Sequence, residues 1–406
     1  MAELLPGLSQ LRLPRMYRVR QRFHGPVVTD LAPVVRASLP AQLRVSGKKV
    51  AVAVGSRGIA NLAVVVKALV AELKANGASV FIVPAMGSHG GGTAEGQRDV
   101  LARLGVTEES VGAPIRSSMD AVKIGAASGV EVFMDAVAFN EADAVVPVAR
   151  VKPHTGFRGR YESGISKMLA IGLGKHVGCS RIHREGYDRF AELIPAAAQV
   201  VLNTGKIAFA LALVENAGEA IAHVEAVSAE NIMAREPELL ERARALMPRL
   251  LLPEIDVLVV NEIGKDISGV GMDSNVTGRG ANGPLAGFNG PKIGRIVVLG
   301  LSAKTHGNAV GVGQADIITE RLFQAIDRTV TYTNALTSGS LSNGKIPVSI
   351  SGDEQAILAA ASCVPGVPAE KARIVRIKNT LQLEEIEVSE SLLESVRGIA
   401  GCEVVQ

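Results

Sequence analysis

The chain has 406 residues, more than a single hydrophobic core usually serves, so its length predicts two domains. Hydrophobic residues make up 47% and charged residues 20%, which excludes a disordered or fibrous protein. The formal charge is +3 and the basic residues are scattered along the chain. Nucleic-acid binding needs a clustered basic face, so the charge pattern argues against it as the main activity.

The cysteines and the apolar runs indicate the cellular location of the protein. Cys179, Cys363 and Cys402 are odd in number and far apart, and they form neither a disulfide framework nor a CxxC metal pattern. The N-terminal region lacks a signal-peptide pattern, and no stretch reaches the ~18 apolar residues of a membrane span. We therefore expect a soluble, cytoplasmic protein without a membrane partner.

The first half of the chain predicts a parallel sheet. From Lys49 the sequence reads KVAVAV, followed by a Gly-bearing turn, a helical pattern that closes on Gly77 and a second apolar run, ASVFIVPAM. This order is a βαβ unit, which implies parallel strands. A helix over residues 93–104 and a strand over residues 142–150 continue the pattern.

Three loops follow the predicted strands of this sheet. They contain Arg57, His89 and the segment after Arg150. Parallel sheets bind ligands at the carboxyl ends of their strands. We therefore expect the three loops to lie at one edge of the sheet.

The second half predicts another α/β unit. A charged helix over residues 228–250, of the kind that bridges domains, precedes the strand EIDVLVV and the strand and loop GRIVVLGLSAKTHGN. ADIITERLFQAID, residues 315–327, is predicted as a helix, and the tail as strand, turn, strand and helix. The expected fold is thus two α/β domains with mostly parallel sheets and an interdomain cleft, divided into residues 1–250 and 251–406.

The segment from Val151 to Gly186 holds the densest set of chemical groups. It reads VKPHTGFRGRYESGISKMLAIGLGKHVGCSRIHREG, and its glycines allow the backbone to approach an anionic ligand closely. His176, Cys179 and His183 are able to bind zinc or nickel, although Cys179 could equally be a packed core residue.

These motifs together resemble one known family. An arginine in the first strand-turn, a GSH loop, KPH followed by a Gly-rich lysine segment, and a further histidine are similar to the nickel-dependent lactate racemase family of 2-hydroxyacid racemases and epimerases. The resemblance covers most of the chain. It is strongest over residues 49–186 and fainter over residues 255–316.

The resemblance implies a cofactor. In this family a nickel-pincer nucleotide, pyridinium-3-thioamide-5-thiocarboxylic acid mononucleotide, is tethered to a lysine, and a histidine completes the nickel coordination. Lys167 in SGISK matches the tethering lysine, and His183 matches the nickel ligand, with His176 as the competing assignment. The match further implies a set of cofactor-binding residues: Arg158, Arg160, Gly164, Lys265 and His306.

The resemblance also implies an isomerase with two acid/base groups. His89 and His154 match the family's catalytic histidines, and each would take the hydroxyl proton of one enantiomer while the α-hydride moves to the cofactor. Arg57 matches the arginine that binds the substrate carboxylate, because a guanidinium can form two parallel hydrogen bonds with it.

The chain departs from the family around the expected substrate. No acidic residue stands directly before Arg57, Ser274 or Asn275 falls where the family has a lysine, and the chain contains no Trp. Ser274 and Asn275 are therefore expected to bind a substrate that is longer and more polar than lactate, such as a sugar acid.

Two other interpretations stay open. A zinc-type hydrolase or lyase would use His176, Cys179 and His183, whereas a metabolite-binding protein would leave Lys167 unmodified. On the leading interpretation the partners are a small 2-hydroxy acid and, transiently, the enzymes that make the cofactor.

Overall fold

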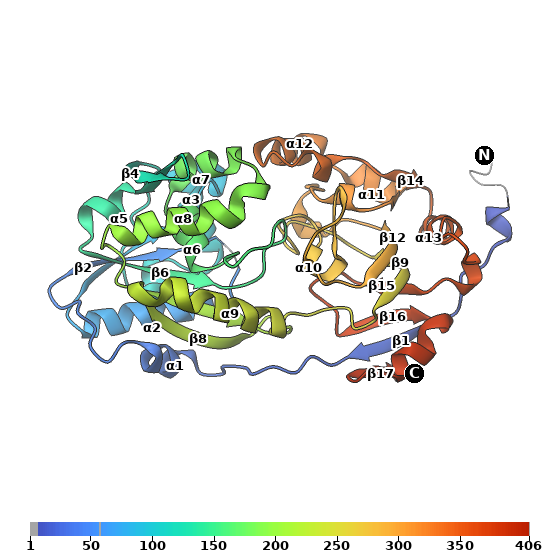
Figure 1. Ribbon diagram of the computed structural model, residues 1–406, viewed down its shortest axis with the longest axis horizontal. Coiled ribbons are helices and arrows are strands. Elements are labelled where there is room, and N and C mark those ends of the chain that lie inside the picture. The colour runs from blue at the N-terminus through green and yellow to red at the C-terminus, as the bar shows by residue number, and fades with distance from the viewer. Residues whose placement is uncertain (1–6, 57, 406) are drawn as a thin grey trace. The chain divides into compact units, whose positions relative to one another are not determined.

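The computed structural model describes residues 7–56 and 58–405 and divides into two units. The central unit is Gly25–Met247, and the terminal unit joins the segment up to His24 to Pro248–Gln406. The sequence had assigned residues 1–250 to one domain, and the structure differs at the N-terminus. There, strand β1 (Met16–Gln21) pairs with β16 (Glu385–Ser389) and β17 (Cys402–Val405) of the terminal unit (Figure 1).

The central unit is built on a five-stranded sheet in the order β3-β2-β6-β7-β8. The first four strands are parallel and β8 is antiparallel to β7. The strands are β2 (Lys49–Val54), β3 (Ser79–Pro84), β6 (Ala144–Arg150), β7 (Phe209–Glu215) and β8 (Ile221–Ser228). Strands β2 and β6 are rich in buried Val and Ala, and β3 in buried Val, Phe and Ile, as expected for parallel strands covered on both faces.

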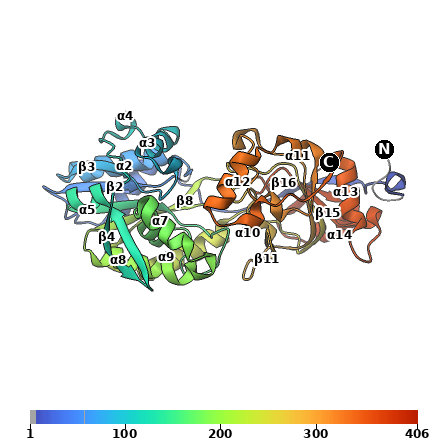
Figure 2. The ribbon, with the colours of Figure 1, turned by 90° about the horizontal axis from the view of Figure 1, so that it is seen from above.

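Helices cover both faces of this sheet, as Figure 1 shows for α2 on one side of β2 and β6 and for α5 and α8 on the other. The helices are α1 (Leu31–Ser38), α2 (Leu62–Ala75), α3 (Ala94–Arg103), α4 (Glu108–Val111), α5 (Ala136–Glu141), α6 (Ile165–Lys167), α7 (Lys175–Arg184), α8 (Phe190–Asn203) and α9 (Ile232–Leu246). A hairpin of β4 (Ala121–Ala127) and β5 (Val130–Asp135), which the sequence analysis did not predict, packs on α7 and α8 (Figure 2).

The terminal unit contains an eight-stranded sheet in the order β14-β13-β12-β9-β15-β16-β1-β17. Its parallel part comprises β9 (Glu254–Val260), β12 (Lys292–Val298), β13 (Ile317–Thr319), β14 (Val348–Ile350) and β15 (Ile374–Ile377). The remaining elements are the short strands β10 (Arg279–Gly280) and β11 (Gly283–Pro284) and the helices α10 (Ser274–Thr277), α11 (Glu320–Ala325), α12 (Arg328–Thr337), α13 (Asp353–Ser362) and α14 (Leu393–Arg397).

The predicted α/β class with mostly parallel sheets is confirmed, and two local predictions need correction. Residues 317–319 of the predicted helix over 315–327 form strand β13, because these buried β-branched residues pair with β12 and β14. Helix α11 begins only at Glu320, where the Thr319 side chain caps it. The charged helix predicted over residues 228–250 is α9, which ends at Leu246 and packs inside the central unit.

None of the helices in the described part of the chain is long and apolar enough to cross a membrane.

Candidate functional site

Neighbouring strands bring the loops of the central unit to one edge of its sheet. β2 pairs in parallel with β3 on one side and with β6 on the other. Ser56 follows β2, His89 follows β3 and His154 follows β6. The expectation that these loops share an edge is confirmed, although Arg57 itself lies outside the described residues.

His89 is exposed, and the side chains of Ser56 and Gln97 are among those that contact its loop. The Ser56 hydroxyl lies 2.5 Å from His89 Nδ1, so it fixes the orientation of the ring. The buried Gln97 amide donates to the carbonyl oxygens of Gly87 at 2.8 Å and His89 at 3.3 Å. Gly90 has φ of +67°, and a Cβ on it would lie 2.5 Å from the Gly96 carbonyl carbon, so glycine is required there.

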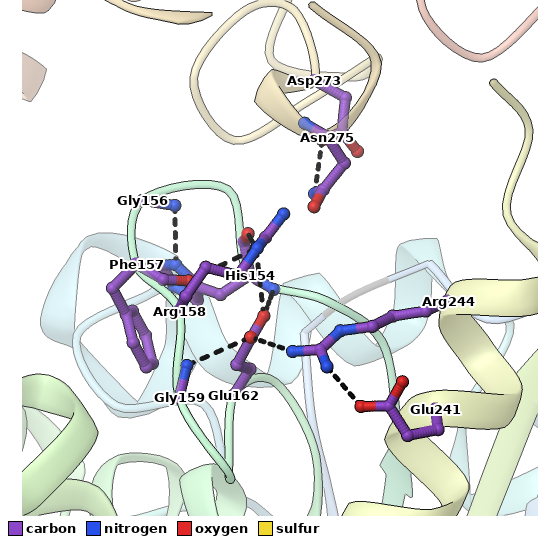
Figure 3. Close-up of polar contacts among 10 residues, drawn as sticks. All are labelled: His154, Gly156, Phe157, Arg158, Gly159, Glu162, Glu241, Arg244, Asp273 and Asn275. Carbon is purple, nitrogen blue, oxygen red and sulfur yellow. Dashed lines mark hydrogen bonds and ion pairs between the residues drawn. The ribbon is translucent and has the colours of Figure 1, made fainter. Parts of the chain in front are cut away.

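A buried carboxylate organises the loop that carries His154 (Figure 3). Glu162 accepts hydrogen bonds from the His154 backbone N–H at 2.6 Å and from Gly159 N–H at 3.2 Å. Glu162 also forms ion pairs with the guanidinium groups of Arg158 at 3.2 Å and Arg244 at 2.5 Å. Arg158 donates in addition to the His154 carbonyl at 2.8 Å. In this structure Arg158, predicted as a cofactor residue, therefore supports the His154 loop.

The His154 ring has a defined hydrogen-bonding state. The backbone N–H of Gly156 donates to His154 Nδ1 at 2.9 Å, so Nδ1 is an acceptor and the neutral ring carries its proton on Nε2. The ring lies 4.5 Å from Phe157 and 6.0 Å from Tyr187, measured between ring centroids.

Lys167 ends α6 and is followed by a π-helical turn over Met168–Gly172. Glu236 from α9 anchors this region, because its Oε2 accepts from Ser166 N–H at 2.9 Å and Ser166 Oγ at 2.5 Å. Burial raises the pKa of Glu236 to about 7, against the opposing effect of the Ser166 hydrogen bonds. A Cβ on Gly164 would lie 2.2 Å from Glu236 Oε1, so Gly164 makes room for this carboxyl group.

His183 and Cys179 form a hydrogen-bonded pair on α7. His183 Nδ1 lies 2.8 Å from the Cys179 carbonyl oxygen and 3.5 Å from Cys179 Sγ. A carbonyl can only accept, so Nδ1 carries the proton and the neutral ring keeps its lone pair on Nε2. Burial favours the neutral forms of the Cys179 thiol and the His183 imidazole. Hydrogen bonding and charge attraction between these two groups outweigh burial, so the pKa of Cys179 is lowered and the pKa of His183 is raised. The positive charge of Lys167 opposes this rise in the pKa of His183.

Aromatic rings connect the two predicted histidines. His154 packs on Phe157 and Tyr187, and His183 packs edge-on against Tyr187 at 6.2 Å and Phe190 at 5.1 Å. Phe190 lies 5.5 Å from Phe157 and 4.8 Å from Tyr187. The sequence analysis did not predict this cluster of aromatic side chains. Its local signals are that Phe157 follows His154 by three residues and that Tyr187 follows His183 by four.

His176 and Arg160, two further predicted site residues of the central unit, lie outside the aromatic cluster around His154 and His183. His176 is exposed, with Nε2 3.4 Å from Ser180 Oγ. Arg160 is exposed and lies over the Tyr161 ring at 5.7 Å. Within residues 7–56 and 58–405, no three His, Cys, Asp or Glu side chains are grouped as metal ligands, so His176, Cys179 and His183 do not form the zinc set that the sequence left open.

The candidates of the terminal unit lie in loops after the parallel strands β9 and β12. The Lys265 N–H donates to Thr305 Oγ1 at 3.0 Å, which joins its loop to the one that carries His306. Lys265 Nζ donates to the Gly269 carbonyl at 2.7 Å, and His306 is exposed with φ of +49°.

Ser274 and Asn275 differ in accessibility. Ser274 is buried, at 1% exposure. Asn275 is partly buried, and its amide Nδ2 donates to Asp273 Oδ1 at 2.7 Å (Figure 3). The predicted role of Ser274 in substrate binding therefore requires this part of the unit to open.

Comparison with known proteins shows limited similarity of this chain to them. Residues 53–234 match a family described as a domain of unknown function, DUF362. No curated protein matches the chain.

Two solved structures are similar to the chain at 14% identity and a TM-score of 0.45. One is a protein from Thermotoga maritima, for which the match covers 68% of this chain and 72% of the other. The second is the lactate racemase apoprotein from Thermoanaerobacterium thermosaccharolyticum, with 88% and 96% covered. Likeness at this level says nothing about the reaction, which has to be inferred from the residues of the site.

Proposed function

We propose that this protein is an isomerase that inverts the α-carbon of a 2-hydroxy acid and uses a nickel-pincer nucleotide attached to Lys167. The observation that carries the proposal is the orientation of His183. The Cys179 carbonyl holds Nδ1, so Nε2 keeps its lone pair. Lys167 ends α6 in the same unit, and its positive charge opposes the raised pKa of His183. A tethering amine and one imidazole ligand are the two groups that this cofactor requires from a protein.

The donor set fits this cofactor better than a free metal ion. In the family that the sequence resembles, the nucleotide supplies three nickel ligands and the protein supplies one histidine. The contact between His183 Nδ1 and a carbonyl is the kind that orients metal-binding imidazoles. When bound, the nickel–pyridinium group supplies the hydride acceptor, which side chains cannot provide.

The two proposed acid/base residues are held differently. The Ser56 hydroxyl can donate to or accept from His89 Nδ1, so His89 can gain or lose a proton and keep this contact. His154 accepts from Gly156 N–H, so it holds its proton at Nε2 and must give up that bond before Nε2 can take a substrate proton. Proton uptake by His89 can therefore leave its Ser56 contact in place, whereas proton uptake at His154 Nε2 requires the loss of its contact with Gly156.

Arg57 is proposed to bind the substrate carboxylate. The remaining proposed contacts, all expectations from sequence, are Arg158, Arg160, Gly164, Lys265 and His306 for the cofactor and Ser274 and Asn275 for a polar substrate. A 2-hydroxy acid with further hydroxyl groups is the proposed substrate class, because Ser and Asn side chains can form hydrogen bonds with those hydroxyl groups.

Intact mass spectrometry tests the proposal directly. The chain is co-expressed with the cofactor-synthesis enzymes and nickel, and any adduct is mapped to a peptide. We expect a cofactor-sized mass gain on Lys167 that is absent in Lys167→Ala and present in the matched control Lys206→Ala.

A second variant separates attachment from metal binding. His183→Ala should keep the adduct on Lys167 and lose nickel, measured by elemental analysis. An unmodified Lys167, under conditions that load a known family member, would refute the proposal and favour a metabolite-binding protein. A positive result leads to a screen of 2-hydroxy acids for a change in optical rotation, in which His89→Ala and His154→Ala should be inactive.

A further inference from the structure

A fully buried lysine lies beneath the loop that carries His89. Lys175 has no exposed surface, and its ammonium group donates hydrogen bonds to the Pro84 carbonyl at 2.9 Å and to Gln97 Oε1 at 3.0 Å. It also forms an ion pair with Asp135 Oδ2 at 3.0 Å. Burying a charge is unfavourable unless it is paired in this way.

The backbone at Lys175 is also unusual. Its φ is +55°, a left-handed conformation that is unfavourable for a residue with a side chain. Strain of this kind persists only where surrounding contacts impose it. The contacts of the ammonium group are therefore among those that hold the first residue of α7 in this conformation.

The network continues from Lys175 to the His89 loop. Gln97 can place either its oxygen or its nitrogen toward Lys175, but the ammonium group can only donate, so the amide oxygen must face it as the acceptor. The Gln97 nitrogen must then face the loop, where it donates to the carbonyl oxygens of Gly87 and His89. Lys175 thus determines which end of the Gln97 amide holds the loop.

Asp135 completes the arrangement from the opposite side. Its Oδ2 pairs with Lys175, and its Oδ1 accepts from the Ala138 N–H at 2.7 Å, at the beginning of α5. Burial lowers the pKa of Lys175, and the Asp135 carboxylate opposes this shift. All three side chains, Lys175, Gln97 and Asp135, are fully buried, so solvent cannot replace any of these bonds.

We propose that Lys175 is a positioning residue: through Gln97 it fixes the loop that presents His89, and Asp135 neutralises its charge. The role in positioning the loop concerns the folded chain alone. Its catalytic consequence rests on the proposed function, because only then does the placement of His89 control proton transfer.

Hydrogen–deuterium exchange on the full chain, without cofactor, tests the positioning role. Gln97→Met removes the contact with the loop and leaves the ion pair, whereas Lys175→Met combined with Asp135→Asn removes both charges together. We expect amide exchange over residues 85–92 to become about tenfold faster in each variant, the factor that loss of one ordinary hydrogen bond produces. If the double variant fails to fold, Gln97→Met decides the question.

A matched control and a spectroscopic signal separate positioning from general stability. Lys206→Met removes a lysine-to-carbonyl bond, to Ala142 at 2.8 Å, elsewhere in the same unit, and should leave residues 85–92 unchanged. With ¹⁵N-labelled histidine, the ring nitrogens of His89 should shift in the Gln97→Met variant, because the Ser56 contact is lost, and should stay unchanged in the control.

The outcomes are distinct from those of the proposed function. Unchanged exchange over residues 85–92 in a folded variant would overturn the inference, as would faster exchange spread evenly over the central unit. An absent adduct on wild-type Lys167 would instead refute the proposed function and leave the exchange result standing. If both hold, kcat for isomerisation should fall in Gln97→Met with little change in KM, since His89 moves while the adduct on Lys167 is retained.

Discussion

Glu236 is a buried carboxyl group whose charge should make the stability of the protein depend on pH. Burial raises its pKa from 4.5 to about 7, although the hydrogen bonds from Ser166 oppose the shift. Glu236→Gln keeps the size of the side chain and an acceptor for Ser166, but it cannot ionise. The variant therefore isolates the free energy of placing a charge at this position.

The sign and size of the effect follow from the two pKa values. Between pH 4.5 and 7 the folded chain binds more protons at Glu236 than the unfolded chain does, so the contribution of this group to stability is complete below about 4.5 and is lost as the pH rises through 7. A shift of this size corresponds to about 3 kcal/mol. Relative to wild type, Glu236→Gln should therefore gain about 2 to 3 kcal/mol in free energy of unfolding between pH 5 and pH 8.

Guanidinium unfolding followed by circular dichroism at pH 5 and pH 8 measures this difference, since the chain has no Trp for fluorescence. Glu254→Gln is the matched control. Hydrogen bonds from Arg373 and Lys292 lower the pKa of Glu254 to about 2, so its contribution is lost only at much lower pH and its difference from wild type should be equal at the two pH values. A constant difference for Glu236→Gln as well would refute the idea that burial controls this carboxyl group.

Two further predictions concern the loops that carry the proposed bases. Arg244→Met should lower the free energy of unfolding by about 2 kcal/mol, because Glu162 loses a close ion pair while it stays buried. Arg242→Met, at an exposed position of the same helix, should change the free energy of unfolding little. Thermal denaturation measures both, and equal effects of the two variants would contradict this assignment. Gly90→Ala and Gly91→Ala both place an alanine at φ of +67°, which costs each about 1 kcal/mol. Only the Cβ at position 90 would meet backbone atoms, so the free energy of unfolding of Gly90→Ala should be lower than that of Gly91→Ala by about 1–3 kcal/mol. Equal stabilities of the two alanine variants would show that the loop relaxes around the added methyl group.

The sequence predicted the elements that local patterns define. The apolar runs of β2, β3 and β6 and the loops after them are readable because a buried parallel strand is continuously apolar and ends at glycine or polar residues. The predicted helix over residues 315–327 was partly wrong because ADIIT is short and its pairing with two strands is not visible locally. The placement of β1 depends on pairing Met16 with Ser389, which no local pattern indicates.

The candidate site divides in the same way. Lys167, His183, His89 and His154 were chosen from motifs, and the structure relates Lys167 to His183 through charge and His154 to His183 through shared aromatic contacts. Their roles in isomerisation stay predictions until Lys167 is tested.

What the sequence determined by itself is the α/β class, the position of most strands and the residue types that chemistry requires. What only the tertiary structure decided is how these residues are held: Ser166 meets Glu236 across 70 positions, and Arg244 meets Glu162 across 82. A carboxylate or lysine in a sequence is ordinarily a surface residue. It becomes a buried anchor only when segments distant along the chain enclose it and supply its hydrogen-bond partners, and that enclosure is a property of the fold and not of any local pattern.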